Sequence, residues 1–335
     1  MCRQLSTMLN AGINILNAMD VLRQQTTNKF LSSILSEIYG KVEKGNPVSF
    51  AMKDYPDVFP DILINMVEAG EVGGSIEKSF EKMAVYFEKE DKLKKKLTNA
   101  LIYPVVVLVV SIIVLNILMI FVMPTFVGIF NEMEIELPAS TRFLLNMSTF
   151  LRAKWYIVFS VIFIAIWIYN VYKRTENGRR NVDKRKLNRP LTGKVALNAI
   201  TARFSRTLST LLNSGVPLIS SLETTSKVLS NAYLEEKFKE VIDRVRGGEA
   251  LSVPIENLNI FPTLVPIMIK TGEESGNLEL MLNKVADFYE DEVDNSVTRL
   301  TAIFEPIVLI LLAIMVGFLM ASIVLPMFKL YGNVQ

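Results

Sequence analysis

The sequence contains no histidine and a single cysteine, Cys2, among its 335 residues. Histidine is the commonest general base and metal ligand in proteins, so its absence excludes Ser-His catalytic pairs and histidine-ligated metals. One cysteine can form neither a disulfide within the chain nor a zinc site of the cysteine type. The composition therefore predicts no catalytic residues, no cofactor and no metal.

A nucleotide-binding P-loop is absent as well. The nearest match, Gly193-Lys194-Val195, lacks the Ser or Thr that must follow the lysine and the earlier glycine of the motif. We therefore expect that any energy-driven process in which the chain takes part is driven by another protein.

Long apolar runs, in contrast, are abundant. Hydrophobic residues make up 50% of the chain, and the mean hydropathy is +0.33. Three runs lie at 101–124, 155–172 and 303–326, and the first contains no charge. A helix needs about twenty apolar residues to cross roughly 30 Å of hydrocarbon, and lipid cannot satisfy unpaired backbone groups. The sequence predicts three transmembrane helices and hence a polytopic membrane protein.

Basic residues gather beside these runs. Before the first run stand Lys92, Lys94, Lys95 and Lys96, and after the second a basic run covers 173–189. The segment between the first two runs has only Arg142, Arg152 and Lys154, and the end of the chain only Lys329. The positive-inside rule places the N-terminus and both large polar segments in the cytoplasm, with 125–154 and 327–335 on the other side.

The basic segment 173–194 admits two interpretations, a solvated linker or a patch held to anionic headgroups. No aromatic residues are interleaved with its charges, so we expect no nucleic-acid partner.

The two polar segments resemble one another. Residues 206–215 repeat residues 3–12 at seven of ten positions, with an offset of 203. With an offset of 202 the correspondence continues from Gly45 to Gly247, from Gly70-Glu71 to Gly272-Glu273 and from Pro104 to Pro306. We therefore predict an all-α protein with two repeated cytoplasmic helical bundles, 1–100 and 195–302, each followed by a membrane span.

The polar segments show the periodicity of short amphipathic helices and no strand-like alternation. A long helix is expected from Ser75, because Ile76, Phe80, Met83 and Phe87 form a core-facing stripe. After Phe87 the stripe gives way to charge, and we expect the helix to continue as a solvated stalk into the first span.

The glycine-rich corners at 70–74 and 272–276 each carry a glutamate, Glu71 and Glu273. Such carboxylates can hold a hard cation, but the alternating oxygen ligands of a calcium loop are missing. The favoured interpretation is a structural corner, with the glutamates near the N-terminus of the next helix, where negative charge is stabilising.

Several motifs together resemble the type II secretion system F family. They are the duplicated bundles, the run at 211–218, the sequence Lys270-Thr-Gly-Glu-Glu-Ser-Gly-Asn-Leu278, Ile303-Phe-Glu-Pro306, and Pro124 followed by Phe126, Leu137-Pro138 and Thr141. The resemblance covers nearly the whole chain. It implies these signature positions: Gly12, Gly70, Glu71, Gly74, Gly215, Gly272, Glu273, Gly276, Glu305 and Pro306.

The same resemblance implies a function and partners. Proteins of this kind are nonenzymatic inner-membrane platforms, which lie over a hexameric cytoplasmic assembly ATPase and pass its movement to pilin or pseudopilin subunits. Other inner-membrane assembly proteins, the lipid bilayer and further copies of the chain are the remaining partners implied. Many members of the family carry several tens of residues before the first motif, which begins here at Arg3. The chain is therefore expected to be either a short member of type IVb-pilus or competence type or one whose N-terminal extension is missing.

Two further hypotheses come from the residues. Lys237, Lys239 and Arg244 lie in a dense mixed-charge run of the second bundle, which suits a transient polar contact with the ATPase, although a solvated surface fits equally. A small transporter or channel using Glu305 and Asn116 is the alternative function, since polar groups inside a membrane are expensive.

Overall fold

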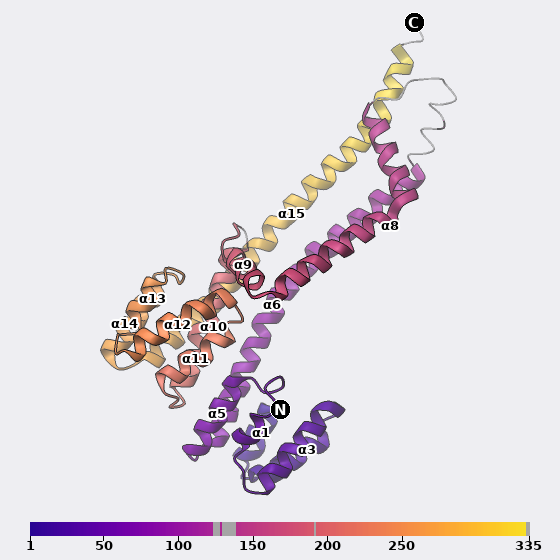
Figure 1. Cartoon of the computed structure of the whole chain (residues 1–335). Coiled ribbons are helices and arrows are strands. Elements are labelled where there is room, and N and C mark those ends of the chain that lie inside the picture. Colours follow the sequence, from indigo (N-terminus) through magenta and orange to yellow (C-terminus); the bar gives the residue numbers. More distant parts are fainter. Residues whose placement is uncertain (123–127, 129–138, 191, 333–335) are drawn as a thin grey trace. The chain divides into compact units, whose positions relative to one another are not determined.

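Helices are the only regular elements in the part of the chain that the computed structural model describes, residues 1–122, 128, 139–190 and 192–332 (Figure 1). The predicted all-α fold class is confirmed over these residues. The chain divides into two compact units. Unit 1 holds Met1–Lys95 and Arg179–Ser296, and unit 2 holds Lys96–Gly178 and Val297–Gln335.

The first bundle comprises residues 1–95 of unit 1. Its helices are α1 (Cys2–Asn10), α2 (Ile15–Gln25), α3 (Lys29–Glu43), α4 (Val48–Met52), α5 (Asp61–Val72) and the first part of α6 (Ile76–Ile117). Asn14 and Asn28 cap α2 and α3 by accepting a hydrogen bond from the backbone N–H three residues later. The predicted short helices are thus confirmed in this bundle.

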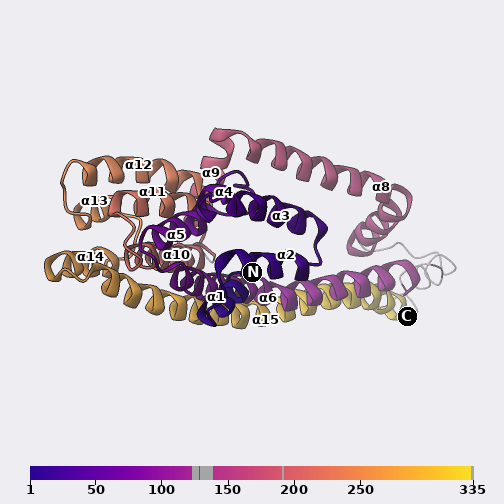
Figure 2. The ribbon, with the colours of Figure 1, turned by 90° about the horizontal axis from the view of Figure 1, so that it is seen from below.

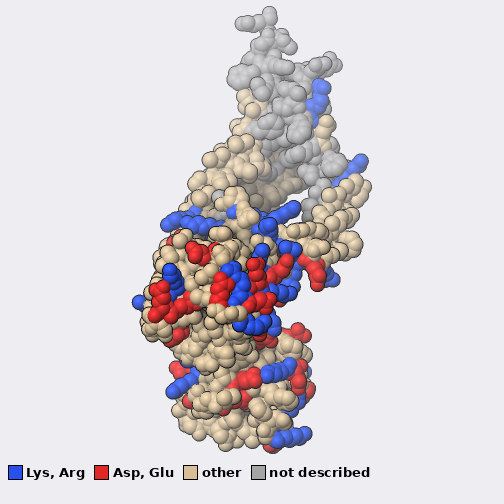
Figure 3. Space-filling view, turned by 60° about the vertical axis from the view of Figure 1, so that its left-hand side comes forward, with Lys and Arg blue, Asp and Glu red and all other residues tan. Residues whose placement is uncertain are grey.

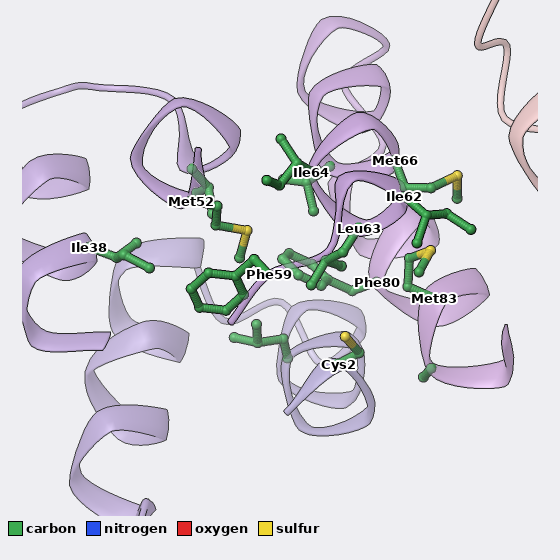
Figure 4. Packing of buried hydrophobic residues seen from close by; sticks show 14 of the residues in the cluster. Cys2, Ile38, Met52, Phe59, Ile62, Leu63, Ile64, Met66, Phe80 and Met83 are labelled. Atoms are coloured by element: carbon green, nitrogen blue, oxygen red, sulfur yellow. The ribbon is translucent and has the colours of Figure 1, made fainter. Parts of the chain in front are cut away.

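One apolar core fills this bundle (Figure 4). Phe59, Leu63, Phe80 and Met83 are its central side chains, each at most 1% exposed. Phe80 and Met83 belong to the predicted stripe on α6, whose other two members are partly buried against the same core. The stripe therefore fixes which side of α6 faces the bundle.

The second bundle comprises residues 179–296 of unit 1. Its helices are most of α9 (Glu176–Leu187), α10 (Gly193–Leu212), α11 (Leu218–Val228), α12 (Ala232–Arg246), α13 (Ser252–Asn257), α14 (Leu264–Ser275) and the start of α15 (Leu278–Gly332). Three phenylalanines, Phe204, Phe238 and Phe261, meet at its centre with ring centroids 4.8–6.1 Å apart. This distance range is favourable for aromatic pairs.

The two bundles touch within unit 1. Helix α5 of the first bundle packs against α10 and α11 of the second (Figures 1 and 2). Leu211 and Val216, both from the second bundle, are buried in the core of the first. Charged side chains of both signs gather over unit 1 on the face shown in Figure 3, whereas the described surface of unit 2 is mostly uncharged there.

Among the described residues, two helices are long and apolar enough to cross a membrane. The segments Ile76–Val114 and Leu278–Gly317 each have a mean hydropathy of 2.4 over their most apolar window. Helix α6 is continuous from the first bundle through its charged stretch into the apolar one, so the predicted continuity is confirmed. The prediction that this stretch is solvated is wrong for its first part, because Leu93 is 8% exposed and Lys89 pairs with two carboxylates of α15. A π-helical turn, η1 (Leu118–Val122), follows it. Helix α15 is likewise continuous from Leu278.

The second predicted span lies in α8 (Ala139–Arg174), a helix with non-helical backbone angles at Lys154. It is not among the helices that meet the length and hydropathy test over the described residues. The crossing number of three therefore stays a prediction. Pro124 and most of the loop after it lie outside the described residues.

The predicted correspondence of Gly45 with Gly247 is wrong by one residue. Gly45 has a φ of +89°, and the residue with that conformation in the second bundle is Gly248, at +92°. Gly247 instead ends α12 with a φ of −73°. The offset between the two bundles is therefore still 203 at these glycines, which follow α3 and α12. The change to an offset of 202 falls later, in the loop that follows α4 or α13.

The glycines before the long helices are required by close packing. A Cβ atom on Gly272 would lie 2.8 Å from the Cα atom of Leu278, and one on Gly70 would lie 3.1 Å from the Cα atom of Ile76 and 2.3 Å from Ser79 Oγ. Backbone atoms cannot give way as a flexible side chain can. Each glycine therefore lets the long helix start directly against the preceding one.

We expect Gly272→Ala to lower the free energy of unfolding by about 1–3 kcal/mol, the usual cost of overpacking a close contact. Gly40→Ala in α3 is the matched control, because nothing lies within 4 Å of the added Cβ there. That change should raise stability by about 0.5–1 kcal/mol through helix propensity. Thermal unfolding of the full chain in detergent measures both. Equal melting temperatures for the two variants would contradict the close-packing argument.

Candidate functional site

The carboxylate of Glu71 is held by backbone groups from another helix. Glu71 lies in the last turn of α5 and accepts hydrogen bonds from the N–H groups of Val48 (2.5 Å) and Ser49 (3.2 Å) and from the Ser49 hydroxyl. These donors form the first turn of α4, whose N-cap residue, Pro47, provides no side-chain cap. Glu71 therefore caps α4 from outside and places negative charge at the positive end of its dipole.

Glu273 makes the same set of contacts in the second bundle. Its oxygens accept from the N–H groups of Leu251 (2.5 Å) and Ser252 (3.2 Å) and from the Ser252 hydroxyl (2.6 Å), at the start of α13. The predicted location, beside the N-terminus of the next helix, is wrong. The glutamates reach back across 21–23 residues to a preceding short helix, because its uncapped N–H groups need an acceptor.

These contacts favour the structural interpretation of the corners over a cation site. Both oxygens of each carboxylate already accept protein donors. Within the described residues no group of three or more acidic or cysteine side chains is arranged to hold a metal ion.

The glycines of the corners close the preceding helices. The Ser75 N–H donates to the Gly70 carbonyl at 2.8 Å, and the Asn277 N–H donates to the Gly272 carbonyl at 2.9 Å. Gly74 and Gly276 have φ angles of +64° and +67°, which glycine adopts without strain. Gly12 and Gly215, with φ angles of +85° and +78°, end α1 and α10. In unit 1 each predicted glycine thus provides a close approach or a positive φ, and each predicted glutamate accepts hydrogen bonds from backbone N–H groups.

Two predicted positions lie in α15. Pro306 is within the helix, and the side chain of Glu305 lies outside the described residues. Asn116, the other polar residue predicted to act within the membrane, donates to the Ile112 carbonyl of its own helix at 2.8 Å.

A polar contact that the sequence did not predict joins the bundles along α6. The Lys82 ammonium donates to the Asn213 carbonyl and side-chain oxygen, both at 2.8 Å, and to the Ser214 hydroxyl at 3.2 Å. These acceptors lie at the end of α10, where a cation is favoured by the helix dipole. Further along α6, the hydroxyls of Tyr86 and Thr207 share a buried hydrogen bond of 2.9 Å.

An ion-pair network continues this contact. Arg206 on α10 pairs with Asp287 and with Glu290 (2.8 Å) on α15, and Lys89 on α6 pairs with the same two carboxylates at 3.1 and 3.2 Å. Burial acts to lower the pKa of Arg206, but its hydrogen bonds to Glu290 and Asp287 outweigh this and raise it. Burial acts to raise the pKa of Asp287, and the hydrogen bonds from Arg206 and Lys89 lower it instead. The Arg206 guanidinium and the Asp287 carboxylate therefore both stay charged near neutral pH.

A cleft of about 710 Å³ lies between α6, α10 and α15 in unit 1. Its charged lining residues are Glu81, Lys82, Lys89, Arg206, Glu279 and Asp287. Lys82 and the Lys89–Arg206–Asp287 network are already engaged with protein partners. The cleft thus presents fixed charges of both signs, an arrangement suited to docking rather than to proton transfer.

The sequence does carry a signal for this contact. Lys82, Tyr86, Lys89 and Leu93 follow one another at spacings of four, three and four residues on α6. Such spacing places them on one face, distinct from that of Phe80 and Met83. Tyr86 and Leu93 are 5% and 8% exposed. A second stripe beside the first indicates a helix that packs on two sides.

The three residues predicted to contact an ATPase do not form one cluster. Phe238, between Lys237 and Lys239 on α12, is completely buried, so the two lysines lie on opposite sides of the buried face of the helix. Lys239 lines a hollow with Glu223 and Arg246. Arg244 makes a bidentate ion pair with Glu249, with both contacts at 2.6 Å. The mixed-charge run therefore belongs to two sides of α12.

Comparison with known families decides the classification. The model of the type II secretion system (T2SS) protein F family matches residues 1–124 and 204–326. The chain belongs to this protein F family. All the predicted signature positions, from Gly12 to Pro306, lie inside the two matched ranges.

Curated relatives of this protein F chain match it almost from end to end. Type IV pilus assembly protein PilC of Myxococcus xanthus is 35% identical over 333 residues, which cover 99% of this chain and 80% of the relative. PilC of Thermus thermophilus is 37% identical over 334 residues, covering 99% and 82%. Type II secretion system protein F of Aeromonas hydrophila is 34% identical over 335 residues, covering 99% and 86%.

We expect Glu71→Ala and Glu273→Ala to lower the free energy of unfolding by similar amounts, about 1–2 kcal/mol each, the usual cost of losing a helix cap. Glu71→Gln and Glu273→Gln should cost less, because the amide oxygen still accepts a hydrogen bond. Glu68→Ala is the control, since the Glu68 carboxylate forms only an exposed ion pair with Lys53. Thermal unfolding provides the measurement.

A cation site would give a different result. In that case Ca²⁺ or Mg²⁺ would raise the melting temperature of the unmodified chain and leave that of the Ala variants unchanged. This outcome would contradict the capping role.

Proposed function

We propose that this protein is an inner-membrane platform of a type IV pilus or type II secretion machine. It couples a cytoplasmic hexameric assembly ATPase to the polymerisation of pilin or pseudopilin subunits, and it is not itself an enzyme. The observation that carries this proposal is the match of 98–99% of the chain to proteins named for type IV pilus assembly and type II secretion.

The long helices support a mechanical role. Helices α6 and α15 each run without a break from a bundle of unit 1 into an apolar segment of unit 2. A continuous α-helix carries displacement along its axis, because each turn is hydrogen bonded to the next, apart from the one bond lost at Pro104 in α6 and at Pro306 in α15. A push on either bundle can therefore reach the membrane segment through the backbone alone.

We propose a topology of three spans, 101–124, 155–172 and 303–326, with two repeated bundles, 1–100 and 195–302, in the cytoplasm. The basic segment 173–194 follows the second span, and residues 125–154 and 327–335 face the other compartment. The proposal rests on the basic residues beside the apolar runs and on the repeated motif.

Cysteine labelling should give opposite results at two positions. In a Cys2→Ser background, an impermeant maleimide added to intact cells should modify Ser140→Cys and leave Asn177→Cys unmodified. After the cells are lysed, both should react. Labelling of Asn177→Cys in intact cells would contradict the proposed topology.

We further propose that the ATPase contacts the second bundle through α12 rather than the first bundle. Lys239 and the exposed pair Arg246–Glu223 border one hollow of about 390 Å³. Lys237 and Arg244 lie seven residues apart and so share the other side of the helix. Charges on two sides of one helix suit a partner that wraps around it.

A charge reversal tests both the function and this contact. Lys237→Glu with Lys239→Glu and Arg244→Glu should reduce co-purification of the assembly ATPase and abolish surface fibres or secretion, while the protein remains inserted. Adding Glu249→Arg restores the ion pair between positions 244 and 249 with its charges exchanged. A defect that persists in this variant does not come from loss of that pair. Lys41→Glu with Lys44→Glu in the first bundle is the matched control and should have a smaller effect.

The outcomes separate the alternatives. Greater sensitivity in the first bundle would contradict the α12 assignment but not the platform role. Intact fibres with lost uptake of a solute would favour a transporter, although Asn116 already has a hydrogen-bond partner in its own helix.

A further inference from the structure

The helix that follows the second predicted span begins at a tight corner. Helix α8 ends at Arg174, and α9 begins at Glu176. The Thr175 hydroxyl donates to the Tyr172 carbonyl at 2.7 Å and accepts from the Gly178 N–H at 3.2 Å. A Cβ atom on Gly178 would overlap the Tyr172 carbonyl oxygen. The first turn of α9 therefore lies directly against the last turn of α8.

The remainder of α9 is attached to the start of α12. Asp183, whose side chain is 5% exposed, accepts a hydrogen bond from the Ala232 N–H at 3.1 Å and pairs with Lys186 at 2.8 Å. Arg180 pairs with Glu236 on α12, also at 2.8 Å. This part of the basic segment is therefore a docked helix and not a free linker.

The basic residues of this segment fall into two groups. Those of the first group are engaged within the protein: Arg180 and Lys186 in these ion pairs, and Lys184, whose ammonium lies 5.4 Å from the centroid of the Tyr233 ring. Those of the second group are exposed and make no side-chain hydrogen bond or ion pair with any described residue: Arg179, Arg185 and Arg189. We call the second group the free arginines.

Acidic residues do not balance this charge. The acidic residues of α9 are Glu176 and Asp183, and Asp183 is buried against α12. The exposed surface of the helix is therefore predominantly positive, and the part of the chain that the structure describes leaves the free arginines available to an anion from outside.

The position of α9 in the chain indicates which anion. Tyr172 is the last residue of the second predicted span, and Trp167 and Tyr169 before it are 61% and 47% exposed. Tryptophan and tyrosine gather at the level of the lipid headgroups. Arg179 directly follows Gly178, so their Cα atoms are about 3.8 Å apart. In the proposed topology, the free arginines therefore begin where the phosphate groups of the cytoplasmic leaflet lie.

We propose that α9 binds the phosphate groups of anionic phospholipids through the free arginines. A guanidinium group suits this ligand, because it donates two parallel hydrogen bonds to phosphate oxygens. Since Asp183 and Arg180 join α9 to α12, the same contact holds the second bundle to the leaflet. The proposal rests on the proposed topology, in which 155–172 spans the membrane and 173–194 is cytoplasmic.

Tryptophan fluorescence of the full chain in vesicles provides the test. The chain has two tryptophans, and Trp155→Phe leaves Trp167, five residues before Tyr172, as the reporter. Phosphatidylcholine vesicles contain either brominated phosphatidylglycerol or brominated phosphatidylcholine, whose bromine atoms quench a tryptophan that they contact. The ratio of the two quenching curves gives the preference for the anionic lipid.

We expect a preference for phosphatidylglycerol of about fivefold or more at low salt, the effect of one well-placed basic residue. Raising the salt to about 0.5 M should bring the preference close to one, because salt screens exposed charges. This measurement uses the protein with its arginines intact.

A charge-removing variant locates the site. Arg179→Gln with Arg185→Gln and Arg189→Gln should reduce the preference to about twofold or less. The matched control, Lys29→Gln with Lys44→Gln and Lys270→Gln, removes the same number of exposed charges elsewhere in unit 1 and should leave the preference unchanged. Lys173 and Arg174 stay in place, because basic residues beside a span fix its orientation.

The outcomes separate this site from the topology on which it rests. Equal quenching by the two lipids, or an equal loss of preference in the control, would overturn the lipid site and favour an acidic protein as the partner of α9. Quenching by neither lipid would overturn the lipid site together with the second span. Fibre assembly and secretion do not enter the measurement.

Discussion

The close approach of backbone to backbone at Gly70 and Gly272 is the constraint on which the rest of unit 1 depends. It starts each long helix directly against the preceding one, with Cα atoms where a side chain would otherwise lie. The neighbouring glutamates then hold the short helices α4 and α13 against the same corner. Each corner therefore sets both where the long helix leaves its bundle and how the bundle closes around it.

The contact between the bundles follows from the starting point of α6. With Phe80 and Met83 directed into the first core, Lys82, Tyr86 and Lys89 are turned toward α10 and α15. Lys82, Tyr86 and Lys89 each have a polar partner in this contact, since hydroxyl meets hydroxyl and each cation meets carbonyl or carboxylate oxygens. One helix thus supplies the apolar core of one bundle and the polar boundary with the other.

Sequence patterns predicted what depends on local periodicity. The stripe at Phe80 and Met83, the ends of the helices at Gly12 and Gly74, and the continuity of α6 all follow from neighbours a few residues apart. The patterns did not predict what depends on distant pairing. Glu71 bonds to residues 22 and 23 positions earlier, and Tyr86 to one 121 positions later. Periodicity shows that a face is occupied, but not by which helix. The shift from Gly247 to Gly248 was missed because two adjacent glycines fit the motif equally well by residue type.

The two equivalent arginine–glutamate pairs of the bundles differ in how far they are exposed to solvent. Arg3 and Glu88 are 48% and 58% exposed, whereas Arg206 and Glu290 are 11% and 26% exposed. At about 0.15 M salt the Debye length is roughly 8 Å, it shortens as salt rises, and exposed charges are screened much more than enclosed ones. Rising ionic strength therefore loosens the attachment of α1 to α6 while α10 stays fastened to α15. Chemically identical ion pairs thereby give the two bundles unequal sensitivity to the ionic strength of the surrounding solution.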